Sequence, residues 1–134
     1  MRTSELTGAA LDWAVAKCEG YTGLHKIEGR MPHEPQLGIW PPRKEYGVMD
    51  LWELGFSTDW AKAGPIIERE WIEVVPWPNE SDENERWQAT QHDLPSRVYC
   101  SGPTPLIAAM RCYVASKLGD EVDVPDELLQ GEQA

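Results

Sequence analysis

The sequence predicts an α+β domain: a small antiparallel sheet of about three or four strands, with an N-terminal helix and a long C-terminal helix packed on one face. Apolar residues recur at helical spacing over residues 7–19 and again over 104–118. Three short, strand-like segments lie together between residues 71 and 101. The 134 residues are enough for one such domain, which we expect at 1–118, followed by an acidic C-terminal tail at 119–134.

The first helix is predicted at residues 7–19, with Thr7 as its N-cap and Gly20 as its stop. One apolar stripe at positions i, i+3, i+4 and i+7 supports it, formed by Leu11, Ala14, Val15 and Cys18. Residues 20–47 contain five Gly and four Pro and show neither helical nor strand periodicity. We therefore expect a long irregular loop at 20–47, with a short strand at 37–40.

The middle of the chain is predicted to return to regular structure. Residues 48–54 fit either a strand or a helical turn. Ser57 or Thr58 is a good N-cap for the helix that follows. The pair Gly64–Pro65 lies inside this helix, so we expect a kink there or two short helices.

Three segments supply the predicted sheet, and a helix closes the domain. Residues 71–75 are rich in β-branched side chains, and residues 86–92 and 97–101 follow as the next two strands of an antiparallel meander. The helix at 104–118 begins with Thr104 as its cap and Pro105 in its first turn. Beyond Gly119 we expect only one weak helical turn, starting at Pro125.

The charge of the chain argues against two classes of partner. There are 23 acidic and 12 basic side chains, a net charge of −11, and ten of the acids lie in residues 80–85 and 119–134. The rest of the chain is nearly neutral, at −1. The charge therefore argues against nucleic acid as a partner, since binding phosphates needs a basic surface. The sequence contains no apolar stretch long enough to span a membrane and no signal-peptide layout, so we expect a soluble, cytoplasmic protein.

The sequence contains no recognisable catalytic or metal-binding motif. The three cysteines show no metal-ligand or redox spacing, and we expect reduced, buried thiols. The three histidines are far apart in the sequence, and no phosphate-binding glycine loop or nucleophile motif is present. We therefore predict no metal, no cofactor and no catalytic residue.

Binding chemistry is better represented, because seven Trp stand against one Phe and are hard to bury fully in so small a core. The STDW segment and the SGPTP segment each open a helix, where free N–H groups can hold an anion. Arginines near a tryptophan suit planar, negatively charged ligands. The candidate ligand-binding residues are Ser57, Thr58, Asp59, Trp60, Trp40, Arg43, Arg69 and Thr104.

Three segments together resemble the NinX proteins of lambda-like bacteriophages and their prophage relatives. They are SELTGAALDWAVAK at 4–17, FSTDWAKAGPIIERE at 56–70 and GPTPLIAAMRCYVASKLGDEVDVPDEL at 102–128. The resemblance implies a phage accessory protein that acts in the cytoplasm of the bacterial host. It implies no catalytic residue, since the family pattern names none.

Three functions remain open at this point. The first is a non-enzymatic small-ligand binder that sequesters a nucleotide-derived host immune signal, by analogy with other phage accessory proteins; we expect it to form a homo-oligomer that deepens a shallow site. The second is a protein–protein inhibitor or adaptor that uses the acidic loop and tail against a basic host surface. The third is a nucleotide hydrolase, for which no acid–base or metal set is identified.

Overall fold

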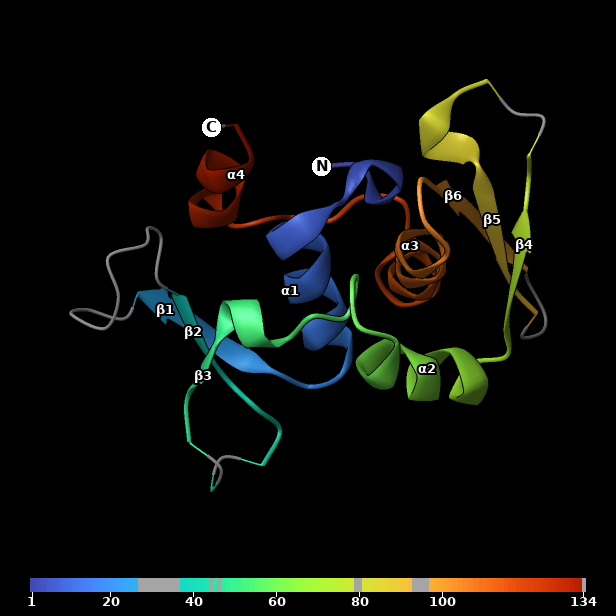
Figure 1. Ribbon diagram of the computed structural model, residues 1–134. Helices are drawn as coiled ribbons and strands as arrows, with labels where there is room; N and C mark the ends of the chain where they lie inside the picture. The colour runs from blue at the N-terminus through green and yellow to red at the C-terminus, as the bar shows by residue number, and fades with distance from the viewer. Residues whose placement is uncertain (27–36, 44, 46, 79–80, 93–96, 134) are drawn as a thin grey trace.

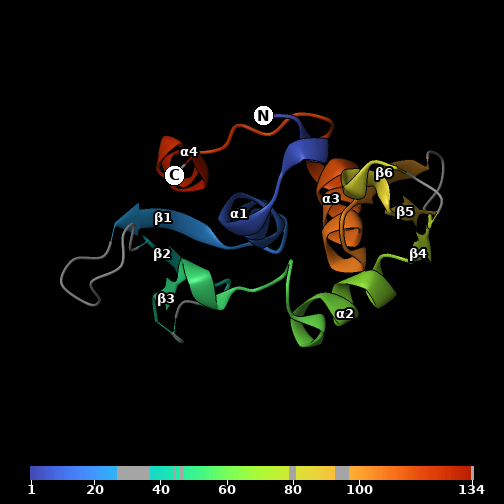
Figure 2. The same cartoon turned by 45° about the horizontal axis from the view of Figure 1, so that its top comes forward.

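The computed structural model describes residues 1–26, 37–43, 45, 47–78, 81–92 and 97–133. These residues form four α-helices and two three-stranded antiparallel sheets, which confirms the predicted α+β class but doubles the number of sheets. The helices α1 (Gly8–Cys18) and α3 (Pro105–Leu118) lie in the centre, with one sheet on either side (Figures 1 and 2). None of the described helices is long and apolar enough to cross a bilayer.

The predicted meander is confirmed. Strands β4 (Ile72–Pro76), β5 (Trp87–Gln91) and β6 (Val98–Gly102) form one antiparallel sheet in that order. The register pairs Ala89 of β5 with Val74 on one side and with Cys100 on the other. Residues that pair across the three strands therefore point to the same face of the sheet, and the next set along the strands points to the opposite face.

Helix α3 packs across one face of this sheet and begins as predicted. The Thr104 hydroxyl accepts the N–H of Ile107 at 3.1 Å, and Gly119 ends the helix with a φ of 89°. The helix lies very close to the end of β6, because a Cβ added at Gly102 would stand 2.7 Å from the Ala108 backbone nitrogen. Only glycine fits there without moving the helix.

Two expectations for the other helices need correction. Thr7 is the N-cap of α1, but its side chain makes no capping hydrogen bond. Helix α2 (Trp60–Arg69) is one continuous helix, which contradicts the alternative of two short helices, whereas a kink at Gly64–Pro65 stays a prediction. Gly64 explains its tolerance of proline, because the residue before proline clashes least with the ring when it lacks a side chain.

The second sheet corrects the loop predicted at 20–47. Strand β2 (Leu37–Trp40) confirms the expected strand, but β1 (Thr22–Lys26) was not predicted; β3 (Met49–Asp50) completes the sheet. Strand β1 is largely exposed, so its sequence lacks the apolar alternation that identifies a strand. A 3-10 helix, η3 (Leu51–Glu53), follows β3. Residues 48–54 were predicted to form either a strand or a helical turn, and they contain one of each.

The acidic tail folds back along the N-terminal segment. The Val122 N–H donates to the Met1 carbonyl at 2.8 Å, and Thr3 donates to the Asp120 carbonyl at 2.8 Å. Buried apolar side chains of the tail join the core: Val122, Val124 and Leu128. The predicted weak turn is instead the start of α4 (Asp126–Gln133).

Candidate ligand-binding face

Four of the predicted site residues lie together at the start of α2. Asp59 is the N-cap, where either Ser57 or Thr58 was expected, and its carboxylate accepts the N–H of Ala61 at 2.9 Å. Ser57 is buried, and its N–H donates to the Asp12 carboxylate at 2.8 Å. The Trp60 side chain is 56% exposed at the first position of the helix. The Asp59 carboxylate already occupies the place where the helix N-terminus would hold an anion.

The other four predicted residues lie elsewhere in the fold. Arg69 is at the opposite end of α2, and the Thr104 hydroxyl caps α3. Trp40 ends β2 in the other sheet, half-buried, and Arg43 is exposed shortly after it. The structure therefore does not bring the eight predicted residues together around one point.

Arg69 belongs to a polar cluster that joins three helices. Its guanidinium meets the Glu19 carboxylate at 2.6 Å and the Glu70 carboxylate at 2.9 Å, and the Tyr113 hydroxyl donates to Glu19. Lys117 lies 3.3 Å from the other oxygen of Glu70. Burial raises the pKa of Tyr113, and its bond to Glu19 raises it further. Because the charges of this cluster face one another, it ties α1, α2 and α3 together.

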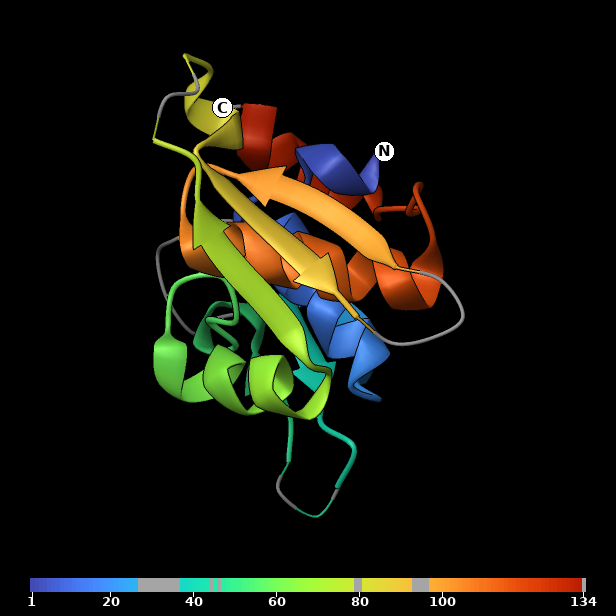
Figure 3. The same cartoon turned by 90° about the vertical axis from the view of Figure 1, so that its right-hand side faces the viewer.

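The β4–β5–β6 sheet offers a different surface. Helix α3 covers one face, where Ile72, Ala89 and Gln91 are buried. The opposite face is left open by the described residues (Figure 3). We call it the outer face; its strand positions are those that alternate with the buried ones: Glu73, Val75, Gln88, Thr90, Tyr99 and Ser101.

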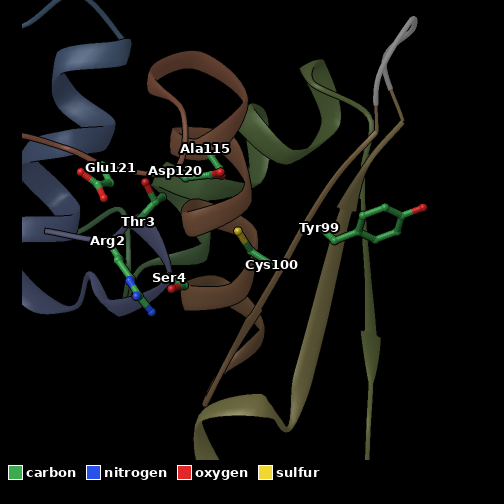
Figure 4. A pocket seen from close by; sticks show the side chains of 8 residues that line it. All are labelled: Arg2, Thr3, Ser4, Tyr99, Cys100, Ala115, Asp120 and Glu121. Atoms are coloured by element: carbon green, nitrogen blue, oxygen red, sulfur yellow. The ribbon is translucent and has the colours of Figure 1, made fainter.

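Exposed aromatic side chains are concentrated on and beside the outer face. Tyr99 is 61% exposed, and Figure 4 shows its ring pointing away from α3, whereas the neighbouring Cys100 points toward it. Trp71 lies directly before β4 and is 76% exposed, and Trp77 lies directly after β4 and is 48% exposed. Three large rings are therefore available to solvent along one sheet, which folding alone does not require.

Exposed basic side chains also flank the strands of this sheet. Arg97 precedes β6, and the alternation of that strand places it on the Tyr99 side. Arg86 precedes β5 and is exposed, but its backbone is helical, with φ −70° and ψ −21°, so the alternation of β5 does not place its side chain. The one acid in the strands of the outer face, Glu73, lies 3.4 Å from the His92 imidazole.

The described residues also line concave sites, one of which reaches Tyr99 at the edge strand of the outer face. The larger, of about 310 Å³, opens between the N-terminal segment, β6 and the tail, and mixes a guanidinium with carboxylates (Figure 4). Its lining residues are Arg2, Thr3, Ser4, Tyr99, Cys100, Ala115, Asp120 and Glu121. The smaller, of about 140 Å³, lies between β1 and the start of α4. Neither of these two pockets is lined by a tryptophan.

The described residues contain no group of three His, Cys, Asp or Glu side chains placed to hold a metal ion. All three cysteines are free. Cys112 is buried as predicted, whereas Cys18 and Cys100 are half-buried. Burial raises the pKa of Cys18 and of Cys100 to about 11 and that of Cys112 to about 12, so these thiols are poor nucleophiles.

Sequence reasoning missed the outer face, although part of its signal was present. Residues 97–101 are predicted as a strand, and successive side chains of a strand point to opposite faces, so Tyr99 and Cys100 must lie on different faces of the sheet. The sequence does not indicate on which face of the sheet α3 packs. That depends on contacts between segments far apart in the chain, such as Gly102 against Ala108.

Comparison with known proteins places this fold in a family. A search of curated proteins finds no match to the chain. The family model described as Bacteriophage P22, NinX, matches residues 2–117, which include both sheets and the helices α1, α2 and nearly all of α3. The chain therefore belongs to the phage P22 NinX family.

Proposed function

We propose that this NinX-family protein is a non-enzymatic binder of a planar, anionic small molecule of nucleotide type, and that it sequesters a nucleotide-derived immune signal in the cytoplasm of the bacterial host. The observation that supports the proposal is the outer face, where three exposed aromatic rings and the exposed Arg97 lie on or beside one open sheet. Sequestration needs only affinity, so the absence of a catalytic motif in the sequence agrees with it.

The chemistry of the outer face suits such a ligand. A planar base stacks on Tyr or Trp, and each such contact contributes about 1–3 kcal/mol. A guanidinium such as that of Arg97 binds phosphate oxygens in pairs. A small ligand meets only the local positive charge, whereas a long nucleic acid would also meet the field of a −11 chain.

A second copy of the chain would complete the site. An open sheet gives a ligand one wall, and enclosed sites bury most of the ligand surface. We therefore keep the homo-oligomer as part of the proposal. Light scattering with and without ligand measures it: a monomer in both states contradicts this part alone.

The direct test is calorimetry on the full chain with a panel of probes: AMP, ADP-ribose, a cyclic dinucleotide, and adenosine as the phosphate-free control. We expect micromolar binding of at least one phosphorylated probe and much weaker binding of adenosine. Tyr99→Ala and Arg97→Gln should each weaken the binding at least tenfold. Trp52→Ala is the matched control, because Trp52 is 74% exposed on η3, which packs against the other sheet.

Two outcomes would overturn the proposal. One is no binding of any probe at micromolar concentration. The other is an equal loss of binding in Trp52→Ala and Tyr99→Ala, which would show that exposed aromatic residues matter without regard to the face on which they stand.

A second candidate function, the protein–protein inhibitor or adaptor, is favoured by a separate observation. The described acids before β5 and in the tail are exposed; both segments lie at the top in Figures 1 and 3, and Figure 1 shows them on opposite sides of the N-terminus. Asn84, within the 3-10 helix η4 (Glu83–Glu85), is held by the buried Arg111 at 3.1 Å, so this acidic segment is anchored. The arrangement offers a negative surface to a basic host protein.

Charge neutralisation tests this candidate better than truncation does. Deleting 119–134 would remove Val122, Val124 and Leu128 from the core, so a loss of function would be ambiguous. A variant that combines Glu83→Gln, Glu85→Gln, Asp123→Asn and Glu127→Gln keeps the packing. If the acidic end binds a host protein, the native chain retains that protein at low salt, and the variant does not.

A further inference from the structure

Trp71 is exceptional in both its backbone and its exposure. Among the described residues other than glycine, it alone has a positive φ, at 55°. Its side chain is also 76% exposed, the largest exposure among the large apolar side chains described. A bulky residue in the left-handed region strains the backbone, and such residues cluster at functional sites.

The turn between α2 and β4 explains the positive φ of Trp71, but it does not explain why the side chain is an exposed indole. Helix α2 ends at Arg69 and Glu70, and the chain must then reverse direction to enter β4. The left-handed position after a helix end is commonly occupied by glycine. Here the neighbours hold it in place: the Glu70 carbonyl accepts from the Gln91 side chain at 3.2 Å, and the Trp71 carbonyl accepts from the His92 N–H at 3.5 Å.

None of those bonds involves the indole. The turn would form as well, and at lower free energy, with glycine at position 71. The indole is also too exposed to contribute much apolar burial. Trp71 therefore has a strained backbone and an exposed indole, and neither feature stabilises the fold. Such a residue is typical of a position that serves binding.

We infer that Trp71 is the principal stacking residue of the outer face and orients the ligand there, with the planar ring on Trp71 and the anionic group at Arg97. This inference rests on the proposed function. Trp71 and His92 lie side by side at one end of the sheet, and Arg97 begins the next strand at the same end. Two strand spacings separate Trp71 from Arg97, about 10 Å, a span that an extended nucleotide covers.

The test uses Trp71→Gly and Trp71→Phe in the full chain, with thermal unfolding and calorimetry against ADP-ribose and AMP. We expect Trp71→Gly to raise the Tm by roughly 3–5 °C and to weaken binding at least tenfold. Trp71→Phe keeps both the ring and the backbone conformation, so its binding should stay within a few-fold of wild type. Trp77→Gly is the matched control: Trp77 is exposed but has no positive φ, so its loss should not raise the Tm.

The outcomes separate this inference from the proposed function. If Trp71→Gly binds as wild type does while Tyr99→Ala does not, the inference is overturned and the proposed function stands. If Trp71→Gly lowers the Tm, the indole supports the fold, and the trade-off argued here is wrong. If wild type binds no probe, the proposed function fails and the inference fails with it.

Discussion

The two faces of the β4–β5–β6 sheet are built from neighbouring residues but differ sharply in burial. On the inner face Ala89 is fully buried, and Gly102 is pressed against the backbone of α3. On the outer face Tyr99, next to Cys100 in the chain, leaves most of its ring in water. Packing accounts for the buried inner residues and for none of the outer aromatics. The difference separates what the fold requires from what binding would use.

The inner face should be the easier one to break, and Gly102→Ala should have the largest effect. The new Cβ would lie 2.7 Å from the Ala108 nitrogen and 3.0 Å from its Cα, so the helix must move. We expect the free energy of unfolding to fall by about 3 kcal/mol. Chemical denaturation measures it. Ser101→Ala, one residue away on the outer face, should change it by less than about 0.5 kcal/mol.

Arg111→Met should have the next largest effect. The buried guanidinium donates to the Leu6 carbonyl at 2.8 Å, to the Ser101 carbonyl at 3.0 Å and to the Asn84 side chain at 3.1 Å. Methionine fills the space but leaves two carbonyls without this donor, although it also removes a buried charge. We expect a loss of about 2 kcal/mol in denaturant unfolding.

The matched variant for that prediction is Arg111→Lys, which keeps the charge and one donor and should fall between wild type and Arg111→Met. Unfolding of Arg111→Met at the wild-type midpoint would contradict the view that Arg111 joins the N-terminal segment, β6 and η4.

Sequence reasoning identified elements whose signals are local. The sequence predicts the cap at Thr104, the helix end at Gly119 and the three alternating strands, and the structure confirms all of them. Strand β1 was missed because its residues are mostly exposed and carry no apolar alternation. The second sheet exists only through the pairing of β1 and β3 with β2, and pairing between distant segments leaves no local pattern.

The candidate site was harder to predict than the fold. Trp60 and Asp59 looked like a ligand site because hydroxyls, a carboxylate and an indole occur together, but Asp59 serves as the cap of α2. The sequence predicts Trp71 only as the first residue of a strand. Its left-handed φ arises from the reversal between α2 and β4, and a tryptophan gives no sign of that in the sequence.

Acid pH should weaken the polar cluster around Arg69 and Glu19. The resulting loss of unfolding free energy should be smaller than the losses caused by Gly102→Ala and Arg111→Met. Burial alone would raise the pKa of Glu19, but hydrogen bonds from Arg69 and Tyr113 outweigh it and lower this pKa from its ordinary value of 4.5. A lowered carboxylate pKa stabilises the fold above pH 4.5, and that contribution is lost as the pH falls through the folded-state value. The effect is modest, because Arg69 is half exposed and solvent screens the pair.

Thermal unfolding from pH 6 down to pH 3 measures this contribution, with Glu19→Gln as the comparison. Glu19→Gln should be less stable at pH 6, and the difference from wild type should shrink toward pH 3. A constant difference over that range would mean that Glu19 acts through packing and not through its charge.

Tyr99→Ala should have the smallest effect on stability, and it tests the difference between the two faces most directly. Tyr99→Ala removes a large ring from the centre of the outer face, yet that ring is 61% exposed and points away from α3 (Figure 4). Unfolding in denaturant should therefore change by no more than about 0.5 kcal/mol. A loss near 2 kcal/mol would show that the ring packs against the fold. The outer face would then need no ligand to explain it, because the tyrosine would be serving stability as the inner face does.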